Sequence, residues 1–113
     1  MVGQVSRTLF EKAREWAAAD PDPQTSASLE AWVRGADERE VRCSFEPPME
    51  FGTAGLRGIV GPGPARMNQA VIRRVSRALA DQVQESCGPR CKVVVGCDAR
   101  LDSNRFCREA AGV

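Results

Sequence analysis

The stretch Glu50-Phe51-Gly52-Thr53-Ala54-Gly55-Leu56-Arg57-Gly58-Ile59-Val60-Gly61-Pro62-Gly63 decides how this chain is interpreted. It holds five of the ten glycines of the chain and a single cation, Arg57. Glycine lets the backbone take positive φ and lets another group approach the main chain closely. Uncovered amides beside a guanidinium are typical of an anion cradle, and the planar fork of arginine can grip two phosphate oxygens. The same glycines also fit a hairpin or bulged turn that only reverses the chain, so the pattern alone leaves both interpretations open.

The glycine stretch differs from the common nucleotide-binding loops. A Walker loop requires Gly-Lys-Ser or Gly-Lys-Thr after its spacer, and neither tripeptide occurs in the chain. The segment Gly61-Pro62-Gly63-Pro64-Ala65-Arg66 departs from the dinucleotide fingerprint at its last position, and its prolines do not suit that turn. These mismatches argue against a nucleotide site. If the stretch is an anion cradle, its one arginine and its amides suit a phosphorylated metabolite.

Composition excludes several classes of function. The formal net charge is +1, and the chain holds four Phe, two Trp and no Tyr, which argues against a nucleic-acid partner. No apolar run approaches the length that spans a bilayer, and the N-terminus lacks a signal-peptide core, so we expect no membrane partner and a cytoplasmic location. The chain has no histidine. This removes the usual general base and the commonest zinc ligand.

The cysteines predict neither disulfides nor a metal site. Five cysteines make an odd count in a chain without a secretion signal, which favours reduced thiols. Cys87 and Cys91 are separated by three residues rather than by the two of a zinc knuckle, and no second pair follows at the right interval. Cys97 and Cys107 have apolar neighbours, so we expect both to be small buried hydrophobes.

The first part of the chain predicts helices. Apolar residues at three- and four-residue steps predict a helix over 5–19. A second short helix is expected between Ser28 as N-cap and Gly35 as C-terminal cap, and a third from Asp37. We interpret residues 1–48 as a helical N-terminal extension whose apolar stripes serve packing.

The remainder predicts the opening of an α/β domain over residues 49–113. The ends of the glycine stretch have strand character, and Asn68 is a good N-cap for the amphipathic helix that follows. The continuous apolar run over 92–97 predicts a strand buried on both faces. Asp98 and Arg100 follow that strand, at the end where α/β sheets bind ligands, although a mutual ion pair or helix cap explains them equally well. A last helix is expected after them.

The segment Met49–Gly58, followed by Gly61–Asn68, resembles the start of the first domain of the alpha-D-phosphohexomutases, the phosphoglucomutase/phosphomannomutase superfamily. Val93–Arg100 is similar to that family's second strand and the Asp-x-Arg after it. The helical extension with its two tryptophans resembles the branch that contains phosphopentose-active mutases and glucose-1,6-bisphosphate synthases. The resemblance implies the beginning of a three-layer α/β/α domain I, incomplete within this chain.

The resemblance also implies an activity, a reversible intramolecular phosphoryl shift on a hexose or pentose phosphate. In the family a phosphoserine donates its phosphoryl group to the sugar phosphate, and a bisphosphate intermediate then returns the other phosphate. Mg²⁺ and a glucose 1,6-bisphosphate-type activator are implied cofactors, and a phosphorylated sugar is the implied partner. Arg57 carries over as a phosphate contact, with Thr53 and Gly55 shaping its loop. Four further residues carry over as possible support for the active site: Gly52, Gly58, Asp98 and Arg100.

The chain also departs from the family pattern. A phosphoserine segment of the Thr-Ala-Ser-His-Asn-Pro kind is absent, as are the Asp-rich magnesium loop, the sugar-recognition loop and the C-terminal phosphate-binding domain. We therefore expect an N-terminal part of a mutase with no catalytic nucleophile and no metal ligands of its own. Such a chain is expected to be inactive, and poorly folded, without the remaining domains. The alternative is an inactive truncated remnant that binds sugar phosphate or a partner protein.

Overall fold

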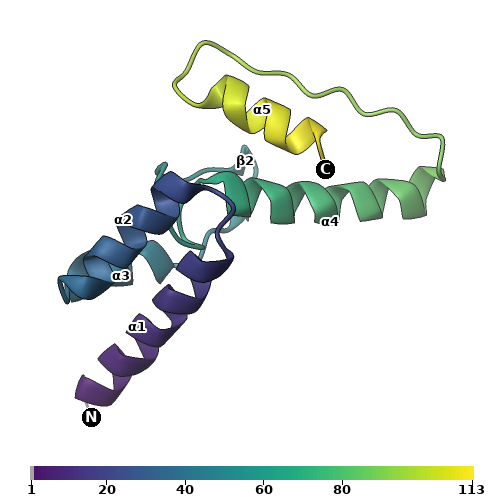
Figure 1. Ribbon diagram of the computed structural model, residues 1–113. Coiled ribbons are helices and arrows are strands. Elements are labelled where there is room, and N and C mark those ends of the chain that lie inside the picture. Colours follow the sequence, from purple (N-terminus) through teal and green to yellow (C-terminus); the bar gives the residue numbers. More distant parts are fainter. Residues whose placement is uncertain (1) are drawn as a thin grey trace. The chain divides into compact units, whose positions relative to one another are not determined.

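The computed structural model describes residues 2–113, and it describes side chains from Arg7 onward. The chain divides into two compact units, Met1–Ala70 and Val71–Val113. In chain order the elements are α1 (Val2–Ala19), α2 (Pro23–Arg34), α3 (Glu38–Phe45), β1 (Phe51–Gly52), β2 (Gly55–Leu56), α4 (Gln69–Cys87) and α5 (Ser103–Ala111) (Figure 1). None of the helices among these residues is long and apolar enough to cross a bilayer.

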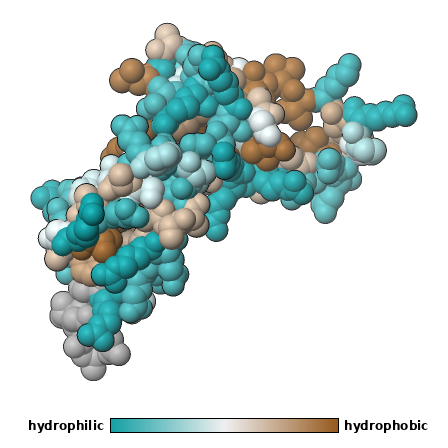
Figure 2. Space-filling model, in the orientation of Figure 1, coloured by the Kyte–Doolittle hydropathy of each residue, from teal (hydrophilic) through white to brown (hydrophobic). Residues whose placement is uncertain are grey.

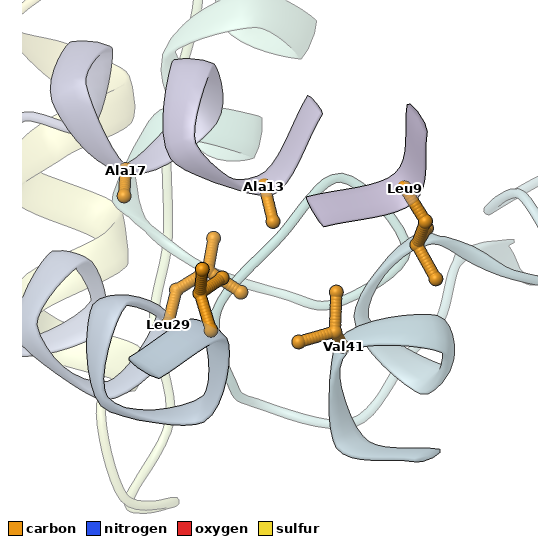
Figure 3. Packing of buried hydrophobic residues seen from close by; sticks show 6 residues of the cluster. Leu9, Ala13, Ala17, Leu29 and Val41 are labelled. Atoms are coloured by element: carbon orange, nitrogen blue, oxygen red, sulfur yellow. The ribbon is translucent and has the colours of Figure 1, made fainter. Parts of the chain in front are cut away.

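The core of the first unit lies between its three N-terminal helices. Leu9, Ala13 and Ala17 fall at four-residue steps, so they share one face of α1. Leu29 of α2 and Val41 of α3 point toward that face (Figure 3), and both are fully buried. The small alanines let the helices approach closely, and this apolar face explains why the segment folds as helices rather than as a loop.

The helix caps confirm two sequence predictions and correct a third. Gly35 is the C-cap of α2 and Asp37 is the N-cap of α3. The prediction of Ser28 as the N-cap of the second helix is wrong. That helix begins at Pro23, and the Asp22 carboxylate caps it by accepting the backbone N–H two residues on, at 2.9 Å. An Asp N-cap followed by Pro is the stronger start signal, whereas the Ser28 hydroxyl donates to a carbonyl one turn earlier within the helix.

A short antiparallel hairpin follows α3. Phe51 of β1 lies opposite Leu56 of β2, and Gly52 lies opposite Gly55. The backbone thus adopts the hairpin that the glycine pattern allowed. A hairpin and an anion cradle are compatible, because the turn residues Thr53 and Ala54 are exposed.

The second unit contains most of α4, then α5 and the segment that joins them. Arg73 of α4 forms an ion pair with Glu109 of α5. Of the predicted apolar stripe of α4, Val71 is buried, whereas Leu79 is 53% exposed. The unit therefore has little core of its own.

The predicted buried strand over 92–97 is wrong. This segment has no strand assignment, and Val93, Val94 and Val95 are 63%, 96% and 42% exposed. The expectation that Cys97 is buried is wrong for the same reason, whereas Cys107 is half-buried. An apolar run becomes a strand buried on both faces only when neighbouring strands and covering layers are present, and residues 2–113 supply neither. The described chain is thus helix-rich with one two-stranded sheet, consistent with an incomplete α/β domain.

Candidate functional site

The β1–β2 hairpin positions three of the predicted site residues. Thr53 is exposed in the two-residue turn, and Gly52 and Gly55 form the pair that closes it. Gly55 has a φ of +90°, whereas a Cβ added there would meet nothing within 4 Å. Glycine is therefore required at this position by backbone conformation and not by space. The hairpin tip is backbone without bulky side chains, open to a ligand.

Arg57 follows β2 directly and is exposed. Within the part of the chain that the structure describes, its guanidinium has no hydrogen bond and no ion pair. The cation nearest to Arg57 in the sequence is Arg66. The aliphatic part of the Arg66 side chain lies against Gly61. An uncommitted guanidinium beside an exposed turn can receive two oxygens of a phosphate without first breaking an interaction. The phosphate contact expected of Arg57 stays a prediction.

Gly58 lets the chain pass close to Met49 after the arginine. A Cβ added at Gly58 would lie 2.5 Å from the Met49 Cε atom. The obstacle is the end of a flexible side chain, so a substitution here displaces the methionine rather than the backbone. Gly58 thus packs closely against Met49, and its role as support for the site stays a prediction.

Asn68 fixes the loop that follows the hairpin. Its side chain is fully buried, and its Nδ2 atom donates to the carbonyl oxygens of Gly61 at 2.9 Å, Gly63 at 2.7 Å and Arg66 at 3.3 Å. Asn68 directly precedes α4, where the sequence predicted an N-cap. Sequence reasoning missed its second role as the residue that holds the loop, and the only signal was an amide at the end of a Gly-Pro-rich segment.

The same loop is fastened to α3. The Ser44 carbonyl oxygen accepts the N–H of Ala65 at 2.9 Å, and Ser44 is 1% exposed. Gly63 has a φ of +97°, and a Cβ there would lie 2.4 Å from the Ser44 oxygen. No sequence pattern indicated this contact. The contact with Ser44 and the hydrogen bonds of Asn68 together hold the loop that follows the hairpin.

Asp98 and Arg100 lie in the second unit and are bound to each other. The Arg100 Nε atom is 3.1 Å from Asp98 Oδ2, and the Arg100 backbone N–H donates to Asp98 Oδ1 at 3.0 Å. The Asp98 backbone N–H donates to the Ser103 hydroxyl at 3.1 Å. The Arg100 N–H is the main cause that lowers the pKa of the Asp98 carboxyl, helped by Ser103 and by the Arg100 charge. This geometry is the mutual ion pair that the sequence left open as an equally good explanation.

Arg100 also borders a hollow of about 530 Å³ in the second unit. Its other lining residues are Asp102, Asn104, Arg105, Arg108 and Glu109. Both carboxylates form ion pairs: Asp102 lies 3.3 Å from the Arg105 guanidinium, and Glu109 pairs with Arg73. The lining therefore leaves a modest excess of positive charge facing the hollow.

Magnesium, the metal that the family resemblance implies, is not matched by these residues. Across residues 2–113 no group of three or more acidic or thiol side chains is placed to hold a metal ion.

The sequence matches known proteins over most of its length. A family model described as "Phosphoglucomutase/phosphomannomutase, alpha/beta/alpha domain I" matches residues 48–113. The chain is 33% identical to a mouse phosphopentomutase over 91% of its own length and 18% of the relative. It is 34% identical to a phosphoribomutase of Saccharomyces cerevisiae over 85% of its own length and 15% of the relative. It is 38% identical to a phosphoglucomutase of Staphylococcus saprophyticus over 67% of its own length and 14% of the relative. No solved structure matches the chain.

The chain thus spans less than a fifth of each of these relatives. The family match begins two residues before Glu50 and includes the hairpin, Arg57 and the Asp98–Arg100 pair. From this match we conclude that the chain belongs to the phosphoglucomutase/phosphomannomutase family, whose alpha/beta/alpha domain I matches residues 48–113.

Proposed function

We propose that this chain supplies the phosphate-binding hairpin of a phosphosugar mutase. The proposed reaction interconverts a hexose or pentose 1-phosphate with the 6- or 5-phosphate through a phosphoserine and a bisphosphate intermediate. The observation that carries the proposal is the uncommitted, exposed guanidinium of Arg57 beside a bare hairpin tip, inside the segment that matches the family. The relatives named as mutases of phosphorylated sugars support the same substrate class.

In this proposal Arg57 binds two non-bridging oxygens of the sugar phosphate, and a backbone amide of the exposed turn binds a third, with Thr53 and Gly55 shaping the loop. Each charge-assisted hydrogen bond contributes about 1.5–3 kcal/mol net. The donors are in place before the ligand arrives, because Asn68 and Ser44 hold the base of the loop. Gly52 and Gly58 support the hairpin. For Asp98 and Arg100 the proposal keeps a supporting role in the active site of the whole protein.

The proposal assigns the remaining chemistry to parts of the protein outside these 113 residues. They include the phosphoserine, the sugar-recognition loop and the magnesium loop, where the metal would neutralise charge on the transferring group. The chain itself is then residues 1–48 as a helical extension and 49–113 as the beginning of a three-layer domain I. By itself it is inactive. A cytoplasmic location and a bisphosphate activator belong to the same proposal.

The second candidate is an inactive remnant that binds a sugar phosphate or a partner protein. The absence of histidine favours it, because no Ser-His-Asn-Pro segment can occur within these residues. Sequencing the transcript beyond the codon for Val113 distinguishes the two candidates. The mutase proposal requires that the reading frame continues past Val113 and encodes such a segment, whereas a stop codon there leaves only the remnant.

Binding is tested by titrating the isotope-labelled chain with glucose 1-phosphate and following its amide resonances. The proposal expects shifts at residues 52–58, and expects them to vanish in Arg57→Ala. Arg39→Ala is the matched control, because Arg39 is an exposed arginine of the first unit and its removal changes the net charge equally. Shifts confined to the hollow of the second unit, or shifts that survive in Arg57→Ala, contradict the assignment.

A further inference from the structure

Two cysteines meet at the turn that follows α4, outside the site described above. Cys87 is the last residue of α4, and three residues separate it from Cys91. The chain reverses at this end of α4 (Figure 1), and hydrophilic side chains reach the surface of the second unit there (Figure 2). Cys87 is exposed and Cys91 is half-buried. A small molecule in solution can therefore reach the first thiol directly.

The backbone of the turn carries Cys91 back against the helix. Gly88 has a φ of +84°, a conformation that commonly ends a helix, and its N–H donates to the Gln84 carbonyl oxygen at 2.9 Å. The N–H of Cys91 then donates to the Gly88 carbonyl oxygen at 3.4 Å. Hydrogen bonds thus hold the turn at both of its ends.

This turn brings the two thiols together. The Cys91 Sγ atom lies 3.9 Å from the Val83 carbonyl oxygen, and in an α-helix that oxygen accepts the N–H of residue 87. Cys91 therefore reaches the helical turn on which Cys87 lies. Burial raises the pKa of the Cys91 thiol, and hydrogen bonding with the Cys87 thiol raises it further. The two thiols are thus neighbours in the folded chain.

The position of this pair does not depend on strands beside the run 92–97. Cys87 belongs to α4, and Cys91 precedes the run. Connections between helices and strands pass over the surface of a domain, so completing the sheet leaves this turn accessible. The other pair of interacting thiols, Cys97 and Cys107, includes a residue of the run itself, and neighbouring strands would change its surroundings.

We propose that Cys87 and Cys91 form a site of reversible thiol oxidation, with a small anionic disulfide such as glutathione disulfide as the oxidant. Arg90 lies between the two cysteines and Lys92 follows them, and both side chains are exposed. Two cations beside the thiols attract an anionic oxidant. The odd cysteine count favours reduced thiols at rest, so the disulfide is the state formed on oxidation. The site does not depend on the phosphate-binding hairpin.

The reaction consists of two thiol–disulfide exchanges. The thiolate of exposed Cys87 attacks one sulfur of glutathione disulfide, so that a mixed disulfide forms and one glutathione leaves as a thiolate. The thiolate of Cys91 then attacks the Cys87 sulfur, the protein disulfide forms, and the second glutathione leaves. Each leaving thiolate takes up a proton, which replaces the proton that a cysteine has lost to solvent. Two cysteine thiols are thus oxidised, and one glutathione disulfide is reduced to two glutathione molecules.

The first test incubates the whole chain with glutathione disulfide, blocks the remaining thiols with N-ethylmaleimide, and maps the product by trypsin digestion and mass spectrometry. Trypsin cleaves after Arg90, so a disulfide is expected to hold the peptide that ends there to the dipeptide Cys91-Lys92. Reduced glutathione in excess is expected to remove this link. Cys91→Ser is expected to keep one glutathione on Cys87, whereas the control Cys107→Ser is expected to form the same link as the wild type. A wild type that stays unmodified, keeps glutathione on Cys87, or links Cys87 to another cysteine overturns the proposal.

The second test separates the geometry of the turn from the spacing of the cysteines. The measured quantity is the ratio of the Cys87–Cys91 disulfide to the mixed disulfide after a fixed incubation. Gly88→Ala is expected to lower this ratio by about fivefold or more, because left-handed backbone is unfavourable for a residue with a Cβ, and the added Cβ meets nothing within 4 Å. Gly96→Ala is the matched control, since its added Cβ also meets nothing and its φ is not positive. Equal ratios in the wild type and Gly88→Ala, or an equal loss in both variants, overturn the proposal.

Discussion

Gly63→Ala is expected to destabilise the first unit more than any other glycine substitution in the hairpin region. The position combines a φ of +97° with a Cβ that would lie 2.4 Å from the Ser44 carbonyl oxygen and 2.7 Å from the Ser44 Cβ. Neither atom belongs to a flexible side-chain end, and Ser44 is buried. The strain therefore cannot be relieved by moving one rotamer; the loop has to separate from α3.

The expected cost is the sum of two effects. Left-handed backbone costs a residue with a Cβ about 1–2 kcal/mol, and overpacking of a close contact costs about 1–3 kcal/mol. The total of about 2–5 kcal/mol is a large part of the free energy of unfolding of a small domain, about 5–15 kcal/mol. Gly55→Ala is the matched control. Gly55 has a φ of +90° but open space around the added Cβ, so only the backbone cost of about 1–2 kcal/mol applies.

Chemical denaturation followed by tryptophan fluorescence measures both variants. Trp16 and Trp32 pack against the core of the first unit, so the signal reports on that unit. The expected order of stability is wild type, then Gly55→Ala, then Gly63→Ala. If Gly63→Ala is as stable as Gly55→Ala, the close approach of the loop to Ser44 is refuted.

Three further outcomes are expected from other sites. Asn68→Ala should lower the free energy of unfolding by about 1–3 kcal/mol, because it removes a buried amide that donates to three carbonyl oxygens of the loop. Chemical denaturation measures this loss, and a loss below the error of the fit would contradict the role of the amide. The Asp98 carboxyl should titrate by NMR below its ordinary pKa of about 3.9, because its folded-state pKa is lowered. Its contribution to stability is therefore complete above the ordinary pKa and is lost as the pH falls through the folded-state pKa. Partial burial raises the pKa of the Cys107 thiol, so at mildly alkaline pH iodoacetamide should modify it more slowly than exposed Cys97; equal rates by mass spectrometry would contradict this.

The sequence could predict the elements that depend on local signals. Helix periodicity, the Gly35 cap and the Asp37 cap are read from a few neighbouring residues, and the structure confirms them. Ser28 was misassigned because two start signals compete within six residues, and Asp22 with Pro23 is the stronger. The correct caps and the wrong one have the same origin, because side chains close together in sequence compete for the N-cap position.

Features that depend on distant residues were not predictable in this way. The run over 92–97 has strand composition, yet composition cannot supply the neighbouring strands that a buried strand requires. The contact of Gly63 with Ser44 joins residues from α3 and from the loop after the hairpin, and no local pattern records it. The glycines and Arg57 identified the candidate site, whereas the residues that hold it in place became visible only in the fold.

The central claim is that Arg57 binds the phosphate of a sugar phosphate, and calorimetric titration with glucose 1-phosphate tests it most directly. Loss of a charge-assisted contact worth about 1.5–3 kcal/mol predicts that Arg57→Ala binds at least tenfold more weakly. Arg57→Lys should fall in between, because an ammonium cannot bind two oxygens with a planar fork, and Arg39→Ala should match the wild type. Equal affinities for the wild type and Arg57→Ala would contradict the claim.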